Sequence, residues 1–125
     1  MRLDGKSALV TGAASGFGAE IARVFAREGA RVTLFDLNRA GAEAVAGEIG
    51  AAAAVVEGDV TKRADVDRAL AAAAGHGGGR VDVIVNNAGW THRNKPLLEV
   101  SEAEFDRVYT TNVKSIYHID RKSVV

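Results

Sequence analysis

The chain has 125 residues, with 16 basic and 16 acidic side chains and no cysteine. This length suits one domain with its own core, and the balanced charge disfavours nucleic-acid binding, which needs a basic excess. No run of about 18 apolar residues is present, which argues against a membrane-spanning helix. The first residues carry no signal-peptide core, and the lack of cysteine excludes disulfides and thiolate metal sites. We therefore expect a soluble, cytoplasmic protein without a metal site.

Short apolar runs alternate with helical patterns along the chain. The runs are typical of parallel strands that are buried on both faces, and they cover residues 7–10, 32–35, 53–56 and 81–85. The helical patterns are a stripe of Phe17, Ile21, Val24 and Phe25 ending near Gly29, two alanine-rich segments at 39–49 and 62–74, and a last segment opening at Ser101.

Two of these helices carry possible capping residues. Thr61 is the expected N-cap of the third helix, and Ser101 with Glu104 forms a capping-box pattern at the start of the fourth. The many alanines between these signals indicate close packing of helices on a sheet, or mild low complexity. Both interpretations stay open at this point.

Four strand–helix units in succession predict a parallel sheet with right-handed crossovers. This is the α/β class with a doubly wound parallel sheet (Rossmann fold), of which the chain would hold the first β-α-β-α-β-α-β-α portion. The expected strand order 3-2-1-4 leaves the fourth strand at an apolar open edge, which predicts a tendency to aggregate. We expect that the natural chain continues and covers this edge.

The stretch "TGAASGFG" places Gly12, Gly16 and Gly18 between the first strand and the first helix. Free N–H groups and the positive helix end meet at such a turn, and glycine lets a pyrophosphate approach the backbone. A tight turn without a ligand is the alternative, although one glycine would serve for that. A P-loop is excluded because no Gly-Lys-Ser/Thr follows.

Asp36 ends the second strand, where an acid can accept both hydroxyls of an adenosine ribose. A 2′-phosphate at the same place would meet like charge. Leu37 and Ser15 bring no positive charge to bind such a phosphate, whereas the nearby Arg39 weakens the argument. These residues favour NAD over NADP, and a solvated acid at a strand end is the alternative.

Two further strand ends carry polar residues. Asp59 could meet the amino group of adenine, and Val60 could flank the ring, although an aspartate here could also serve a turn. The fourth strand ends in Asn86, Asn87, Ala88 and Gly89, and ligands of open α/β sheets bind at the carboxyl ends of strands. The asparagines could also satisfy local backbone groups.

Taken together, these motifs resemble the classical branch of the short-chain dehydrogenase/reductase family over the whole chain. Its members include 3-oxoacyl-carrier-protein reductases and sugar or polyol dehydrogenases, which this sequence looks most like. The resemblance rests on Thr11-Gly12-x-x-x-Gly16-x-Gly18, Asp36, Asp59-Val60, Asn86-Asn87-Ala88-Gly89 and Asn112. We therefore expect residues 1–125 to be a dinucleotide-binding domain that is truncated at its carboxyl end.

The resemblance also implies roles for individual residues. The three glycines would shape the pyrophosphate turn, with Phe17 beside the nucleotide. Asn87, Ala88 and Gly89 would line the ribose next to the nicotinamide. Asn112 would hold a water in the proton relay of an Asn-Ser-Tyr-Lys catalytic set. Asn112 also stands out by itself, because a polar residue on an apolar helical stripe needs a hydrogen-bond partner.

The family's chemistry needs a serine and a Tyr-x-x-x-Lys pair, and no Tyr-x-x-x-Lys occurs in these 125 residues. Tyr117 is no substitute, because Arg121 follows it in place of lysine and arginine does not give up its proton. Trp90 and His92 could contact substrate or lie in solvent, and His76 is expected in a loop.

Three functions remain at this stage. The first is an NAD-dependent oxidoreductase that moves a hydride between nicotinamide and a small carbonyl or secondary-alcohol substrate, as a homo-oligomer (dimer or tetramer) like much of the family. The second is a catalytically incomplete module that binds dinucleotide without turnover. The third is a methyltransferase-like nucleotide binder. No nucleic-acid or membrane partner is expected.

Overall fold

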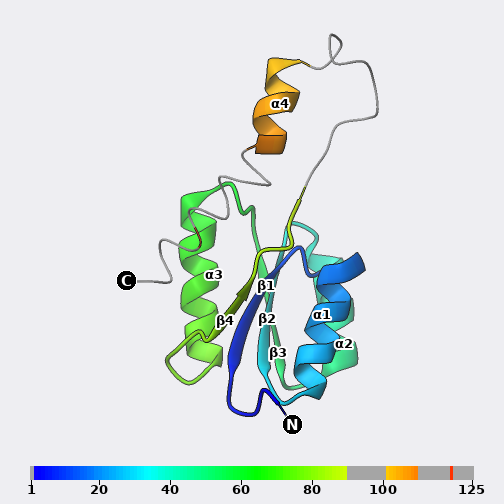
Figure 1. Cartoon of the computed structure of the whole chain (residues 1–125), viewed down its shortest axis with the longest axis vertical. Coiled ribbons are helices and arrows are strands. Elements are labelled where there is room, and N and C mark those ends of the chain that lie inside the picture. The colour runs from blue at the N-terminus through cyan, green and yellow to red at the C-terminus, as the bar shows by residue number, and fades with distance from the viewer. Residues whose placement is uncertain (1, 90–100, 110–118, 120–125) are drawn as a thin grey trace.

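The computed structural model describes residues 2–89, 101–109 and 119. Within these ranges strands and helices alternate as predicted (Figure 1). The elements are β1 Ser7–Thr11, α1 Gly16–Arg27, β2 Arg31–Asp36, α2 Arg39–Ile49, β3 Ala53–Glu57, α3 Arg63–His76, β4 Val83–Val85 and α4 Glu102–Tyr109.

The four strands form one parallel sheet in the order β3-β2-β1-β4, which confirms the predicted order. In the register of this sheet, Val10 of β1 lies beside Leu34 of β2 and Val85 of β4. All five residues of β1 are buried, because strands flank both of its edges and helices cover both faces of the sheet. The continuous apolar runs in the sequence reflect this burial on both faces.

Helices cover both faces of the sheet, with α1 and α2 on one side and α3 on the other (Figure 1). Successive strand residues point to opposite faces, so neighbours in sequence enter different cores. Val10, Val32 and Leu34 pack with α1 and α2. Leu9 and Phe35 pack with Val66, Ala69 and Ala73 of α3. The predicted doubly wound α/β architecture is therefore confirmed for the first portion of the fold.

The alanines serve close packing. Ala19 and Ala22 of α1 and Ala69 and Ala73 of α3 are all buried against the sheet. Small side chains allow a helix backbone to lie near the strands, and the space is filled by the larger strand residues Leu9, Leu34 and Phe35. Close packing therefore accounts for these four alanines, whereas Ala44, Ala64 and Ala71 are exposed.

The predicted apolar stripe of α1 is wrong in part. Phe17 is 83% exposed and Val24 is 37% exposed, whereas Gly18, Ala19 and Ala22 are the buried residues of this helix. Ile21 and Phe25 are partly buried at the edge of the core. Half of the predicted stripe therefore packs against the core, and the small residues set the face that approaches the sheet most closely.

Two further expectations about α3 are wrong. Lys62 rather than Thr61 is the N-cap, without a side-chain cap bond, because the Thr61 hydroxyl donates to Asp59 Oδ1 at 2.7 Å instead. His76 is the last residue of α3 rather than part of a loop, and its Nε2 lies 2.8 Å from the Ala52 carbonyl oxygen.

The start of α4 follows the capping pattern. The backbone N–H of Glu104 donates to Ser101 Oγ at 3.1 Å, which confirms Ser101 as the capping residue. In Figure 1, α4 lies beyond the carboxyl ends of the strands.

The strand β4 is short and half-buried, and it pairs with β1 along one edge. Among the strands that the structure describes, none pairs with its other edge. Aggregation through this edge stays a prediction.

Candidate cofactor site

A cavity of about 440 Å³ opens at the carboxyl end of the sheet. The loops that follow all four strands contribute to it, and so does α4. Its walls are Gly12, Phe35, Asp36, Leu37, Gly58, Asp59, Val60, Thr61, Ala88, Gly89, Asp106 and Arg107. This is the edge at which open α/β sheets bind ligands.

Gly12 and Gly18 are required by close contacts within the protein. A Cβ on Gly12 would lie 2.9 Å from Ala88 Cα, and Gly12 has a φ of +64°. A Cβ on Gly18 would lie 2.5 Å from Asn87 Nδ2 and would overlap the Gly12 carbonyl oxygen. The groups that approach these two glycines are therefore the protein's own: the loop after β4 at both positions, and the Gly12 carbonyl at Gly18.

Gly16 differs from the other two glycines. Its φ of +58° favours glycine, but no atom of the described residues lies within 4 Å of the position that a Cβ would take, so its outer side is open. Ser15 is the N-cap of α1 without a side-chain cap bond, and the first turn holds no acidic residue. The backbone N–H groups of residues 16–18 have no acceptor within the described part of the chain. Such an end of a helix is suited to bind an anion.

Thr11 joins the glycine turn to the loop after β4, a role that the sequence analysis did not assign to it. Its buried Oγ1 accepts the backbone N–H groups of Asn87 at 3.0 Å and Ala88 at 2.9 Å, and donates to the Val85 carbonyl at 3.3 Å. Asn87 Nδ2 in turn donates to the Gly12 carbonyl at 3.2 Å. A hydroxyl at the end of a buried apolar strand was the available signal, because such a group needs partners.

The carboxylate of Asp36 is held from two sides. Oδ2 accepts the N–H of Ala14 at 2.9 Å, and Oδ1 accepts the N–H of Asn38 at 2.8 Å. A carboxylate oxygen has two lone pairs, so each oxygen keeps capacity for a further donor in the cavity. The adjoining Leu37 is 62% exposed and also lines the cavity.

Arg39 is paired away from the cavity. Its Nε lies 2.8 Å from Glu43 Oε1 on the exposed side of α2, and Arg39 does not line the cavity. The Arg39 guanidinium, which could favour the 2′-phosphate of NADP, is therefore paired with an acidic side chain.

Asp59 and Val60, in the loop after β3, also line the cavity. Asp59 Oδ1 accepts the N–H of Thr61 at 2.9 Å and its hydroxyl at 2.7 Å, and the N–H of Asp59 donates to Asp65 Oδ2 at 2.9 Å. Val60 is buried against the core cluster that contains Phe35. Asp59 thus both fixes this loop and faces the cavity with its neighbours.

The family model for the short chain dehydrogenases matches residues 6–124. This chain belongs to the short-chain dehydrogenase family. Its sequence is 51% identical over 120 residues to 4-formylbenzenesulfonate dehydrogenase of Comamonas testosteroni, with 94% of this chain and 47% of that protein covered. Sorbitol dehydrogenase of Cereibacter sphaeroides is 43% identical over 113 residues, with coverages of 90% and 43%.

A solved structure of a 3-ketoacyl-(acyl-carrier-protein) reductase from Brucella melitensis, complexed with NADH, has the same fold. It superimposes with a TM-score of 0.92 and 50% sequence identity, over 96% of this chain and 49% of that chain. The chain spans about half the length of the relatives that it matches.

The structure brings together seven of the twelve residues predicted to bind cofactor. The residues that line the cavity are Gly12, Asp36, Leu37, Asp59, Val60, Ala88 and Gly89. The residues that do not line it are Ser15, Gly16, Phe17 and Gly18, at the start of α1, and Asn87, which packs behind the glycine turn.

The predicted catalytic Asn112 lies outside the described residues, as do Trp90, His92 and Tyr117. In the ranges that are described, no group of three histidine or acidic side chains could hold a metal ion, and no helix is long and apolar enough to cross a membrane.

Proposed function

We propose that residues 1–125 are the dinucleotide-binding domain of an NAD-dependent oxidoreductase, and that the catalytic serine, tyrosine and lysine lie in further chain. The substrate is a small carbonyl compound or secondary alcohol. The bound nicotinamide would supply or accept the hydride, as this cofactor does in other enzymes. Relatives named as sorbitol and D-threitol dehydrogenases support a polyol or related alcohol.

The observation that carries the proposal is the fixed carboxylate of Asp36 in the cavity wall. Backbone donors hold it on both oxygens before any ligand arrives. Ribose hydroxyls can donate to the remaining lone pairs, and hydrogen bonds to a charged acceptor contribute about 1.5–3 kcal/mol each. A 2′-phosphate would instead meet this carboxylate at close range, and Arg39 is engaged with Glu43. We therefore propose NAD rather than NADP.

The start of α1 would bind the pyrophosphate. Its first-turn N–H groups are available as donors, and the open side of Gly16 gives an anion access to them. Phe17, which is 83% exposed at this turn, would cover the dinucleotide on one side. Asp59 and Val60 would hold the adenine, and Ala88 and Gly89 would line the path toward the nicotinamide.

The proton chemistry is assigned to Asn112 and to the serine and Tyr-x-x-x-Lys set beyond these residues. Asn112 would hold a water that relays the proton. The assembled enzyme would be a homo-oligomer in the cytoplasm, without nucleic-acid or membrane partners.

A second candidate function rests on one sequence fact. These 125 residues contain no Tyr-x-x-x-Lys. A protein with no more than these residues would bind the dinucleotide without moving a hydride.

The decisive experiment combines intact mass with titrations by NADH and NADPH, followed by the nicotinamide fluorescence. We expect NADH to bind more tightly than NADPH. A mass near 13.1 kDa with binding but no turnover of any carbonyl would establish the second function. A longer chain that oxidises NADH with a carbonyl substrate would establish the first. Absence of binding by either dinucleotide would reject both.

A further inference from the structure

The loop between β3 and α3 is fastened by residues of α3 that do not belong to the cavity. Asp65 lies in the first turn of α3, and its side chain is 26% exposed. Its Oδ2 accepts the backbone N–H of Asp59 at 2.9 Å. The backbone position of Asp59 is therefore set by a carboxylate six residues further along the chain.

Arg68 adds a second attachment one helical turn later. Its Nη2 donates to the Glu57 carbonyl, at the end of β3, at 2.5 Å, and lies 3.5 Å from Asp65 Oδ1. The loop is thus tied to α3 on both sides of Gly58. Because Asp65 and Arg68 are on the same face of the helix, one rigid element holds both attachments.

Gly58 shows how closely the loop is packed. A Cβ at this position would lie 2.8 Å from Phe35 Cε1 and 3.0 Å from Asp65 Cβ. On the other side, the Gly58 N–H donates to the Asp36 carbonyl at 3.1 Å. The loop therefore lies between the end of β2, which carries Asp36, and the first turns of α3.

The side chain of Asp59 is constrained as well. Thr61 occupies Oδ1 with two donors, so Oδ2 is the oxygen left to accept a hydrogen bond from a ligand. With the backbone N–H bonded to Asp65 and Oδ1 bonded to Thr61, the direction of Oδ2 is fixed by the protein alone.

We propose that Asp65 is a positioning residue that acts through Asp59 and helps this site to select adenine over other purines. This inference rests on the proposed binding of NAD. The exocyclic amino group of adenine is a hydrogen-bond donor, and a carboxylate oxygen held in a fixed direction can accept it. Without the Asp65 acceptor, the Asp59 backbone is free to shift, and the hydrogen bond to the amino group is weakened.

The test compares NADH with reduced nicotinamide hypoxanthine dinucleotide, which carries a carbonyl where adenine carries its amino group. For Asp65→Ala we expect the affinity for NADH to fall about tenfold and the affinity for the hypoxanthine analogue to fall less than about threefold. Asp65→Asn keeps an acceptor for the Asp59 N–H and should bind NADH within about threefold of the unmodified protein. Asp67→Ala, which removes an exposed carboxyl of the same helix, is the matched control and should change neither affinity.

A merely structural role for Asp65 would lower both affinities equally in Asp65→Ala. The ratio of the two affinities would then stay unchanged, and that result would overturn the inference. Amide hydrogen exchange of Asp59, measured without ligand, gives a second readout, for which we expect about tenfold faster exchange in Asp65→Ala and near-normal protection in Asp65→Asn. Unchanged exchange in Asp65→Ala would reject the positioning contact itself. Failure of the unmodified protein to bind NADH would reject the proposed function and the adenine preference with it, whatever the exchange result.

Discussion

Single side chains in this protein serve the fold and the ligand site together. The carboxylate of Asp36 accepts two backbone N–H groups, from Ala14 in the glycine turn and from Asn38 at the start of α2. It thereby joins two loops that surround the cavity, in addition to the ribose contact we propose. With the proposed ribose contact, cofactor binding and folding stability would be coupled at this residue.

We expect Asp36→Ala to lower the affinity for NADH roughly tenfold, because the ribose loses its acceptor. The difference in affinity between NADH and NADPH should also decrease, because the carboxylate no longer repels a 2′-phosphate. The same change leaves two N–H groups without an acceptor and should cost about 1–3 kcal/mol of stability. Titration with both cofactors and urea unfolding measure the two effects. A preference ratio equal to that of the unmodified protein would show that Asp36 does not contact the ribose.

Thr33 shows the opposite situation, a buried hydroxyl that is left unsatisfied. Its side chain is fully buried in β2, and its Oγ1 makes no hydrogen bond to any of the described residues. Thr33→Val removes the unsatisfied group at nearly constant shape, so we expect a gain of about 1 kcal/mol. Thr11→Val is the matched comparison, because the Thr11 hydroxyl makes three bonds, and it should destabilise. Urea midpoints compare the two variants, and a loss of stability in Thr33→Val would contradict the prediction.

At the scale of elements, each glycine of the first helix and its turn has a different physical reason. Gly18 is needed because the Gly12 carbonyl and Asn87 lie against it, whereas Gly16 is needed for its backbone conformation. Gly47, inside α2, has neither reason, since none of the described atoms lies within 4 Å of its Cβ position and it is not at a positive φ.

Substitutions by alanine should separate these cases. Gly18→Ala forces the turn and the loop after β4 apart and should cost about 1–3 kcal/mol. Gly47→Ala should stabilise by about 0.5–1 kcal/mol, because glycine is unfavourable within a helix. Thermal unfolding of the two variants shows whether each substitution raises or lowers the stability. Equal destabilisation would show that the close contact at Gly18 is not the cause.

The elements themselves were predictable because their signals are local. Apolar runs gave the four strands, and Ser101 gave the start of α4. Two of the errors arose where the outcome depends on contacts distant in sequence: His76 reaches the carbonyl of Ala52, and the packed face of α1 is set by small residues that fit the sheet. The error at Thr61 is local, because Asp59, two residues earlier, accepts its hydroxyl.

The same division holds for the site. Asp36, Asp59 and the loop after β4 follow strand ends, so topology alone placed them around one cavity. Thr11, Gly58 and Asp65 could not be assigned, because each acts through a partner that only the folded chain brings near.

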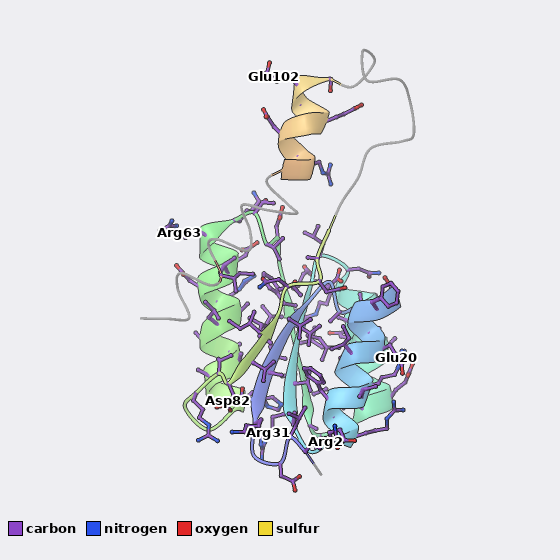
Figure 2. The ribbon with its side chains drawn as sticks, in the orientation of Figure 1. Arg2, Glu20, Arg31, Arg63, Asp82 and Glu102 are labelled. Carbon is purple, nitrogen blue, oxygen red and sulfur yellow. The ribbon has the colours of Figure 1, made fainter. Side chains whose placement is uncertain are left out.

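At the scale of the whole molecule, the amino end of the sheet is held by a separate set of polar contacts. Asp82 Oδ2 accepts the backbone N–H of Ser7 at 2.8 Å and the Arg80 guanidinium at 3.1 Å, while Arg80 also reaches the Gly5 carbonyl. In Figure 2, Asp82 and Arg31 lie at the end of the sheet opposite Glu102 of α4.

The Ser7 N–H, followed by Arg80, lowers the pKa of the Asp82 carboxyl below its ordinary value, although desolvation opposes this. Since the folded pKa is the lower one, the contact stabilises above the unfolded pKa of about 3.9 and is lost as the pH falls through the folded value. We therefore expect Asp82→Asn to be less stable at neutral pH, with a smaller further loss below about pH 4. Urea unfolding at a series of pH values measures this, and identical pH profiles would contradict it.

The sheet therefore has one end that carries the proposed cofactor site and one end where Asp82 and Arg80 secure the strands. Asp82 and Arg80 lie far along the strands from Asp36 and the glycine turn. A change at the securing end can alter how long the protein survives heat or acid while leaving its choice of cofactor alone. Stability and cofactor preference should therefore be adjustable independently of each other. The region for changing stability alone comprises Gly5, Ser7, Arg80 and Asp82.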